Sequence, residues 1–112
     1  MSFYETEKLL DKLLMILNDL DPNNNDLDLL IAQKGLYDIA DCKHSSFVQD
    51  HLYSNDDEII DDFKILNHDE KIVIVKFLDC CIGYMNRSVE DNKPAHYERF
   101  SHILRLLENF RN

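Results

Sequence analysis

Glycine and proline are scarce in this sequence, and so are the patterns that indicate β-structure. Only two Gly and two Pro occur among 112 residues, and no run of alternating apolar and polar residues is bounded by a hairpin turn. No stretch approaches the ~20 consecutive apolar residues of a membrane span. The N-terminal residues have neither the basic flank nor the apolar run of a secretory signal. We therefore expect one all-α domain over residues 1–112 that is soluble and cytoplasmic.

The sequence also lacks the motifs of nucleotide, nucleic-acid and zinc chemistry. No glycine-rich loop is present to bind phosphates, and the basic residues form no patch interleaved with aromatic residues. Cys42, His44 and His51 lie close in the sequence, but neither a C-x-x-C pair nor His-Glu-x-x-His occurs. We expect no metal, no cofactor and no contact with nucleic acid or membrane, and we interpret the protein as a non-enzyme.

Oxygen-bearing side chains in the segment 19–25 are spaced like the start of a calcium-binding loop. Such a loop requires a tight turn at its sixth position and a bidentate carboxylate at its twelfth. Counting from Asp19, those positions hold Asn24 and Leu30. A capped turn between two helices is therefore the better interpretation.

The three cysteines, Cys42, Cys80 and Cys81, are odd in number, and the last two are neighbours that cannot easily pair without strain. We expect reduced thiols, as in a reducing compartment. Cys80 and Cys81 fall in the most apolar stretch of the chain. Burial there is expected to raise their pKa values and to leave them unreactive.

The spacing of apolar residues predicts a compact bundle of four main helices and one or two short ones. Ser2 and Glu5 form a capping-box signature for a first helix that ends near Leu20. The turn at 21–25 cannot continue this helix, because Pro22 disfavours helix at the residue before it.

A second helix is predicted to start from a cap at Asn25 or Asp26 and to end before a break at residues 41–46. We interpret Gly35 as a point of close approach, because Gly inside a helix costs about 1 kcal/mol relative to Ala unless packing needs it. The residues expected to face the core are Leu27, Leu30, Ile31, Leu36, Tyr37 and Ala40.

The middle of the chain predicts a short amphipathic piece over residues 47–53 and then a helix capped near Asn55. The buried face of this helix is expected to carry Ile59, Ile60 and Phe63, with Leu66 as a further candidate. Its first turn holds three carboxylates, which the helix dipole favours.

The run at 72–82 is rich in β-branched residues, so a strand competes with a helix for its first half. A helix is preferred because Asn67 and Glu70 form a capping signature and the run exceeds ten residues. Pro94 suits the first turn of a last helix. The apolar residues of that helix are Tyr97, Phe100, Ile103, Leu104, Leu107 and Phe110.

Negative charge is concentrated in the middle of the chain. Residues 19–70 hold 14 Asp and Glu against three Lys and Arg, and the whole chain has a formal net charge of −10. Such a field raises the encounter rate with a basic partner and discourages contact with nucleic acid or anionic membrane.

Helical geometry indicates which acidic residues of the helix after Asn55 are available to a basic partner. If Ile59, Ile60 and Phe63 face the core, a step of about 100° per residue places Asp57 and Asp61 on the opposite side. A solvated surface is one interpretation of these acids, and an acidic rim around an aromatic anchor is the other. The residues expected to bind a partner are Asp50, Tyr53, Asp56, Asp57, Glu58, Asp61 and Asp62.

The segment from Phe63 to Leu78, in which residues 66–71 open a helix bearing Val75 and Phe77, belongs to a small acidic helical domain. In this segment, and in being a small acidic helical domain, the chain resembles the small bacterial immunity proteins that accompany polymorphic toxins. The resemblance is greatest to the cytoplasmic ones paired with contact-dependent growth inhibition toxins. The resemblance implies neutralisation of a basic toxin domain, commonly a nuclease, by covering its active site or substrate groove.

Two other functions stay open at this point. A helical adaptor or regulatory subunit would bind an apolar partner surface, or a second copy, and its association would depend little on salt. A small metal-dependent enzyme using scattered His and carboxylates would carry stoichiometric metal. The inhibitor hypothesis instead predicts salt-sensitive binding of a basic protein.

Overall fold

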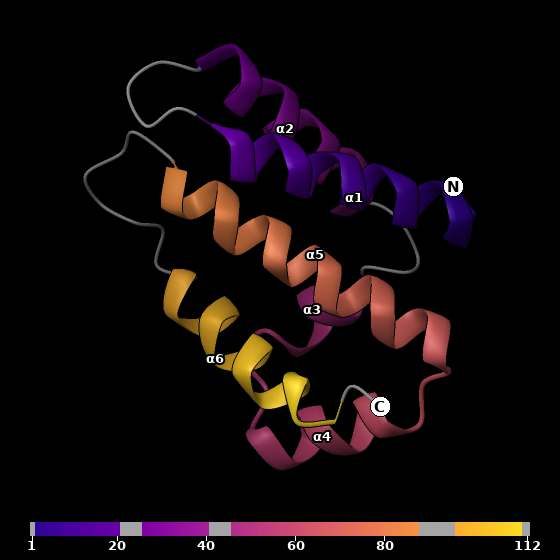
Figure 1. Ribbon diagram of the computed structural model, residues 1–112. Helices are drawn as coiled ribbons and strands as arrows, with labels where there is room; N and C mark the ends of the chain where they lie inside the picture. The colour runs from indigo at the N-terminus through magenta and orange to yellow at the C-terminus, as the bar shows by residue number, and fades with distance from the viewer. Residues whose placement is uncertain (1, 21–25, 41–45, 88–95, 111–112) are drawn as a thin grey trace.

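The computed structural model describes residues 2–20, 26–40, 46–87 and 96–110, and the described chain is helical with no strand. This confirms the predicted all-α bundle, which has four longer helices and two short ones (Figure 1). The elements in chain order are α1 (Phe3–Asp19), α2 (Asp26–Ala40), α3 (Ser46–His51), α4 (Asp56–Lys64), α5 (His68–Arg87) and α6 (Tyr97–Glu108).

Helix α1 begins at the predicted capping box. The Ser2 hydroxyl accepts a hydrogen bond from the Glu5 backbone N–H at 3.2 Å, and the Ser2 N–H donates to Glu5 Oε2 at 3.3 Å. The helix ends at Asp19, with Leu20 as its C-cap in an extended conformation. Leu10, Leu13 and Leu17 form its buried stripe, because residues three and four apart share one face of a helix.

Helix α5 is the central element, since it packs against α1 on one side and α6 on the other and also touches α2 and α3 (Figure 1). Its β-branched first half is helical, as preferred, and the Asn67 side chain accepts from the Glu70 N–H at 2.8 Å. Packing on several sides explains why its buried residues are spread around the helix. They are Val73, Ile74, Val75, Phe77, Leu78, Cys80 and Met85.

Helix α2 is turned differently from the prediction. Its buried residues are Ala32, Gly35, Leu36 and Ile39, so only Leu36 of the six expected core residues is buried. A Cβ added at Gly35 would meet the Leu13 side chain at 2.9 Å. The close approach predicted at Gly35 therefore exists, and the side of α2 that carries Gly35 packs against α1.

The prediction that the other five residues of α2 face the core is wrong for four of them. Leu27, Leu30, Ile31 and Tyr37 are exposed, and Ala40 is half-buried. The prediction failed because α2 is apolar nearly all round, so the apolar pattern alone did not identify which side packs.

The predicted faces of α4 and α6 agree better with the structure. Ile59 and Phe63 of α4 are fully buried and Ile60 is half-buried. In α6, Ile103 and Leu107 are fully buried. The predicted roles of Pro94, Asn25 and the turn at 21–25 lie outside the described residues. No helix in the described part of the chain is long and apolar enough to cross a membrane.

Candidate functional site

The acidic helix α4 is fixed by its cap and by its buried face. Asn55 Oδ1 accepts a hydrogen bond from the Glu58 N–H at 2.9 Å, which satisfies one of the free donors at the helix start. With Ile59 and Phe63 inward, the carboxylates of Asp57, Glu58 and Asp61 are exposed. We call these three residues the α4 acidic face. No ion pair found among the described residues involves any of them.

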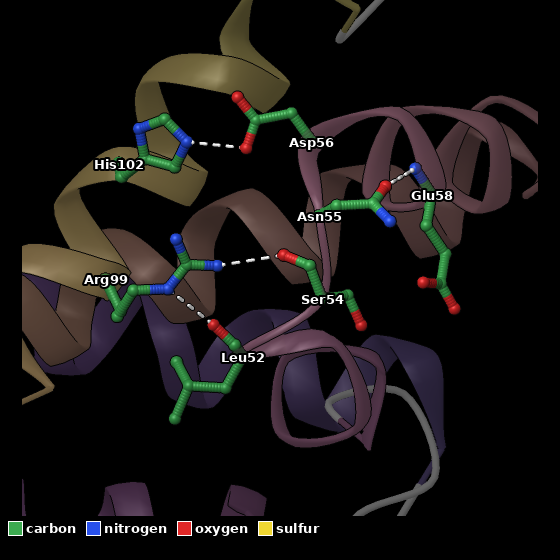
Figure 2. Close-up of polar contacts among 7 residues, drawn as sticks. All are labelled: Leu52, Ser54, Asn55, Asp56, Glu58, Arg99 and His102. Carbon is green, nitrogen blue, oxygen red and sulfur yellow. Dashed lines mark hydrogen bonds and ion pairs between the residues drawn. The ribbon is translucent and has the colours of Figure 1, made fainter.

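Asp56 begins α4, and its exposed carboxylate pairs with a side chain of α6. Its Oδ1 lies 2.7 Å from Nε2 of His102. Arg99, one turn earlier on α6, donates from Nε to the Leu52 carbonyl at 2.7 Å and from its terminal nitrogen to the Ser54 carbonyl at 3.1 Å (Figure 2). These three contacts tie the start of α4 and the segment before it to α6.

Asp62 is held from the other side of α4. Its Oδ2 lies 2.7 Å from Nε2 of His51, whose Nδ1 lies 2.9 Å from the Phe47 carbonyl oxygen. The His51 ring also stacks on the Phe47 ring, with centroids 4.1 Å apart. Asp62 therefore connects α4 to α3, and its carboxylate already has a partner within the chain.

Tyr53 is 69% exposed, but its hydroxyl oxygen lies 2.6 Å from Nδ1 of His96. The ring is therefore presented at the surface beside the start of α6. Asp50 is exposed and lines a groove between α3 and the start of α5, together with Asp69 and Glu70. Asp50 is thus grouped with acids of α5 and not with the α4 acidic face.

The structure therefore divides the seven predicted partner-binding residues. Asp57, Glu58 and Asp61 share one exposed face, whereas Asp56 and Asp62 are engaged by histidines. The histidine partners were missed because they lie 11 and 46 residues away in the chain. Asp69 and Glu70 were also missed, although their place in the first turn of a predicted helix was a usable signal.

The arrangement can bind cations or basic groups, and the thiols of the described residues lie away from it in α5. Burial raises the pKa of the Cys80 thiol, and it raises the pKa of the Cys81 thiol to about 12. Cys80 is fully buried, as expected, whereas Cys81 is partly exposed. Cys42 lies outside the described residues. Within the described ranges no three His, Cys, Asp or Glu side chains converge into a metal-binding group.

Comparison with protein-family models, with curated proteins and with solved structures finds no match to this chain.

Proposed function

We propose that this protein is a non-enzymatic inhibitor of the immunity type. It binds a basic toxin domain, a nuclease by preference, and it does so through the α4 acidic face. One observation carries the proposal: Asp57, Glu58 and Asp61 are exposed on a helix whose two other acidic residues are held by histidines. The helix is anchored on both sides, yet these three carboxylates point outward.

Such an arrangement suits recognition of a phosphate-binding surface. A nuclease active site or substrate groove collects Lys and Arg to neutralise phosphates, and carboxylates can pair with the same cations. Because α4 is held by α3 and α6, little conformational freedom is lost when a partner binds, which favours affinity. The net charge of −10 adds long-range attraction that speeds the encounter.

The test needs a basic toxin domain, which is to be sought among the genes that neighbour the one encoding this chain. Its binding to the wild-type protein is measured by surface plasmon resonance at 50 and 500 mM salt, together with inhibition of its nuclease activity. The test variant is Asp57→Asn/Glu58→Gln/Asp61→Asn. We expect its association rate to fall about tenfold at low salt, because charge steering acts mainly on that rate.

The matched control removes three exposed charges elsewhere, as Asp19→Asn/Glu98→Gln/Glu108→Gln. It should change the association rate much less, since the effect of a charge depends on its distance from the interface. Equal losses for both variants would remove the α4 acidic face from the interface. Tight binding that ignores salt would favour the adaptor function instead.

A further inference from the structure

Helix α2 carries an apolar surface that the fold does not use. Leu27, Leu30, Ile31 and Tyr37 are 71%, 59%, 45% and 65% exposed. Their positions in the helix place them on one side, opposite the buried Ala32 and its neighbours, and the exposed Lys34 and Asp38 project from the same side. Single exposed apolar residues are normal, but four large ones on one side of a helix indicate an interaction surface. We call these four residues the α2 apolar face.

Neither the core nor the helix requires this face to be apolar. The four side chains take no part in the hydrophobic core, and α2 is attached to α1 through the opposite side of the helix. Polar residues such as Gln and Lys have equal or better helix propensity than Ile and Tyr. Folding of this chain therefore gives no reason to keep Leu27, Leu30, Ile31 and Tyr37 apolar.

The face continues into a groove between α2, α5 and α6. Tyr37 and Leu36 line one wall, and Phe77, Tyr84 and Phe100 contribute to the rest. The groove has a volume of about 320 Å³, which lies at the lower end of the range of ~300–1,000 Å³ for ligand pockets. A hollow beside an apolar helix face gives a place where one large side chain of a partner helix can anchor.

The charges around the face determine which partner fits. Asp26, Asp28 and Asp38 accompany a single Lys34 on α2, and the whole chain carries −10. A second copy would bring the same negative charge to the interface, and anionic lipid or nucleic acid would be repelled as well. A partner helix with an apolar stripe and flanking Lys or Arg suits both the apolar residues and the three carboxylates that accompany them on α2.

We propose that the α2 apolar face and the adjoining groove are a docking surface for a basic amphipathic helix of a partner protein. In Figure 1, α2 and α4 lie at opposite ends of the molecule, with α1 and α5 between them. The docking surface is thus separate from the α4 acidic face, and the proposal does not depend on the toxin-inhibitor function.

The test probe is a labelled 18-residue helical peptide built from Leu and Lys, with the leucines on one face. Two comparison peptides separate the contributions: one keeps the leucine face but replaces Lys by Glu, and the other scrambles the Leu/Lys order. We expect fluorescence anisotropy to show binding of the Leu/Lys helix and at least tenfold weaker binding of both comparison peptides.

Two protein variants locate the binding surface. Leu27→Gln/Leu30→Gln/Ile31→Gln changes only exposed side chains and should weaken binding of the Leu/Lys helix about tenfold or more. The control variant, Asp57→Asn/Glu58→Gln/Asp61→Asn, should bind within twofold of wild type.

Amide chemical-shift changes in the wild-type protein give a readout that does not depend on the folding of a variant. They should cluster on α2 and around Tyr84 and Phe100. Shifts that cluster on α4, or a loss of binding in the α4 variant alone, would overturn the docking proposal while leaving the toxin-inhibitor function standing. Equal binding of the Leu/Glu helix would overturn the charge argument and the proposal with it.

Other occupants of the face are also tested directly. Sedimentation of the wild-type protein at high concentration should show a monomer. A dimer that the Gln variant abolishes would identify a second copy as the occupant and would overturn the proposal. Binding of the wild-type protein to phosphatidylglycerol vesicles through this face would overturn it as well.

Discussion

Gly35 lies directly against Leu13: a Cβ added to the glycine would be 2.9 Å from Cδ2 and 3.0 Å from Cδ1 of the leucine. Leu13 is fully buried, so its side chain has little room to move away. This contact sets how closely α2 approaches α1 and thereby which side of α2 remains outside.

Gly35→Ala should therefore lower the free energy of unfolding. Ala gains about 1 kcal/mol of helix propensity over Gly, but overpacking a core costs about 1–3 kcal/mol, so we expect a net loss of about 1 kcal/mol. Urea denaturation measures it. Gly83 of α5 is the matched control, because its added Cβ would meet Leu17 at an ordinary 3.5 Å.

Gly83→Ala should instead raise the free energy of unfolding by about 0.5–1 kcal/mol, since only the propensity term acts there. In a Leu13→Val background the loss from Gly35→Ala should shrink, because the terminal carbons that oppose the new methyl are removed. Two alanine variants that shift stability in the same direction would contradict the close-approach argument.

Lys76 of α5 connects to α1 through two carboxylates. Its Nζ lies 3.0 Å from Glu7 Oε1 and 2.8 Å from Asp11 Oδ1. Burial alone would lower the pKa of Lys76, but hydrogen bonds and charge attraction from Asp11 and Glu7 together outweigh it, so the pKa is raised above 10.5. The charged form is thus the one that the fold favours.

Lys76→Met should lower the free energy of unfolding at pH 7 by about 1 kcal/mol, a value limited by solvent screening of the partly exposed pair. A lysine whose pKa is raised by folding stabilises the fold fully at pH values below its pKa in the unfolded chain. This stabilisation is lost as the pH rises through the pKa in the folded protein. The difference from wild type should therefore shrink above pH 10.5. Lys12→Met, an exposed control, should show neither effect.

The sequence predicted the buried side of α4 correctly and that of α2 incorrectly. In both helices the outcome depends on how the apolar residues are distributed around the helix axis. In α4, Ile59, Ile60 and Phe63 are the apolar members of a helix that is otherwise strongly charged, so only one side can be buried. In α2, apolar residues surround the helix, and the choice of side depends on the fit of Gly35 to Leu13. Steric fit between distant segments is not written in local spacing.

The candidate site shows the same limit. Helical geometry was enough to place Asp57 and Asp61 on an exposed face, because that inference uses only residues of one helix. It was not enough to separate them from Asp62 and Asp56, whose histidine partners come from α3 and α6. Pairing between elements requires the tertiary arrangement, which a sequence pattern does not specify.

Cys80 and Cys81 should react very slowly with thiol reagents in the native protein. Burial raises the pKa of Cys81 to about 12, so its thiolate fraction at pH 7.5 falls about three-thousandfold below that of a free cysteine, whose pKa is about 8.5. Cys80 is fully buried, and its Sγ donates to the Leu10 carbonyl at 3.5 Å.

The rate is measured with a chromogenic disulfide in a Cys42→Ser background, so that only Cys80 and Cys81 report. Both thiols should titrate rapidly once guanidinium unfolds the protein, which provides the control. A native thiol that reacts as fast as free cysteine would contradict the burial argument.

Asp61 and Asp62 are neighbours in α4, but removing the charge of each should change the free energy of unfolding differently. Asp62 is paired with His51 at 2.7 Å, in a contact where the histidine side chain is only 16% exposed. Asp62→Asn should therefore lower the free energy of unfolding by about 1 kcal/mol. Asp61→Asn should leave it unchanged or raise it by a few tenths of a kcal/mol, because it relieves repulsion with Asp57 four residues away.

Urea denaturation of the two single variants at pH 6 gives the comparison, and His51→Gln supplies the partner's contribution. The double variant His51→Gln/Asp62→Asn should lose less than the sum of its single variants, as expected for residues that interact directly. Equal changes in the free energy of unfolding for Asp61→Asn and Asp62→Asn would mean that Asp62 gains no stability from His51. Strict additivity of the Asp62 and His51 variants would mean the same. Either result would contradict the anchoring of α4 through α3.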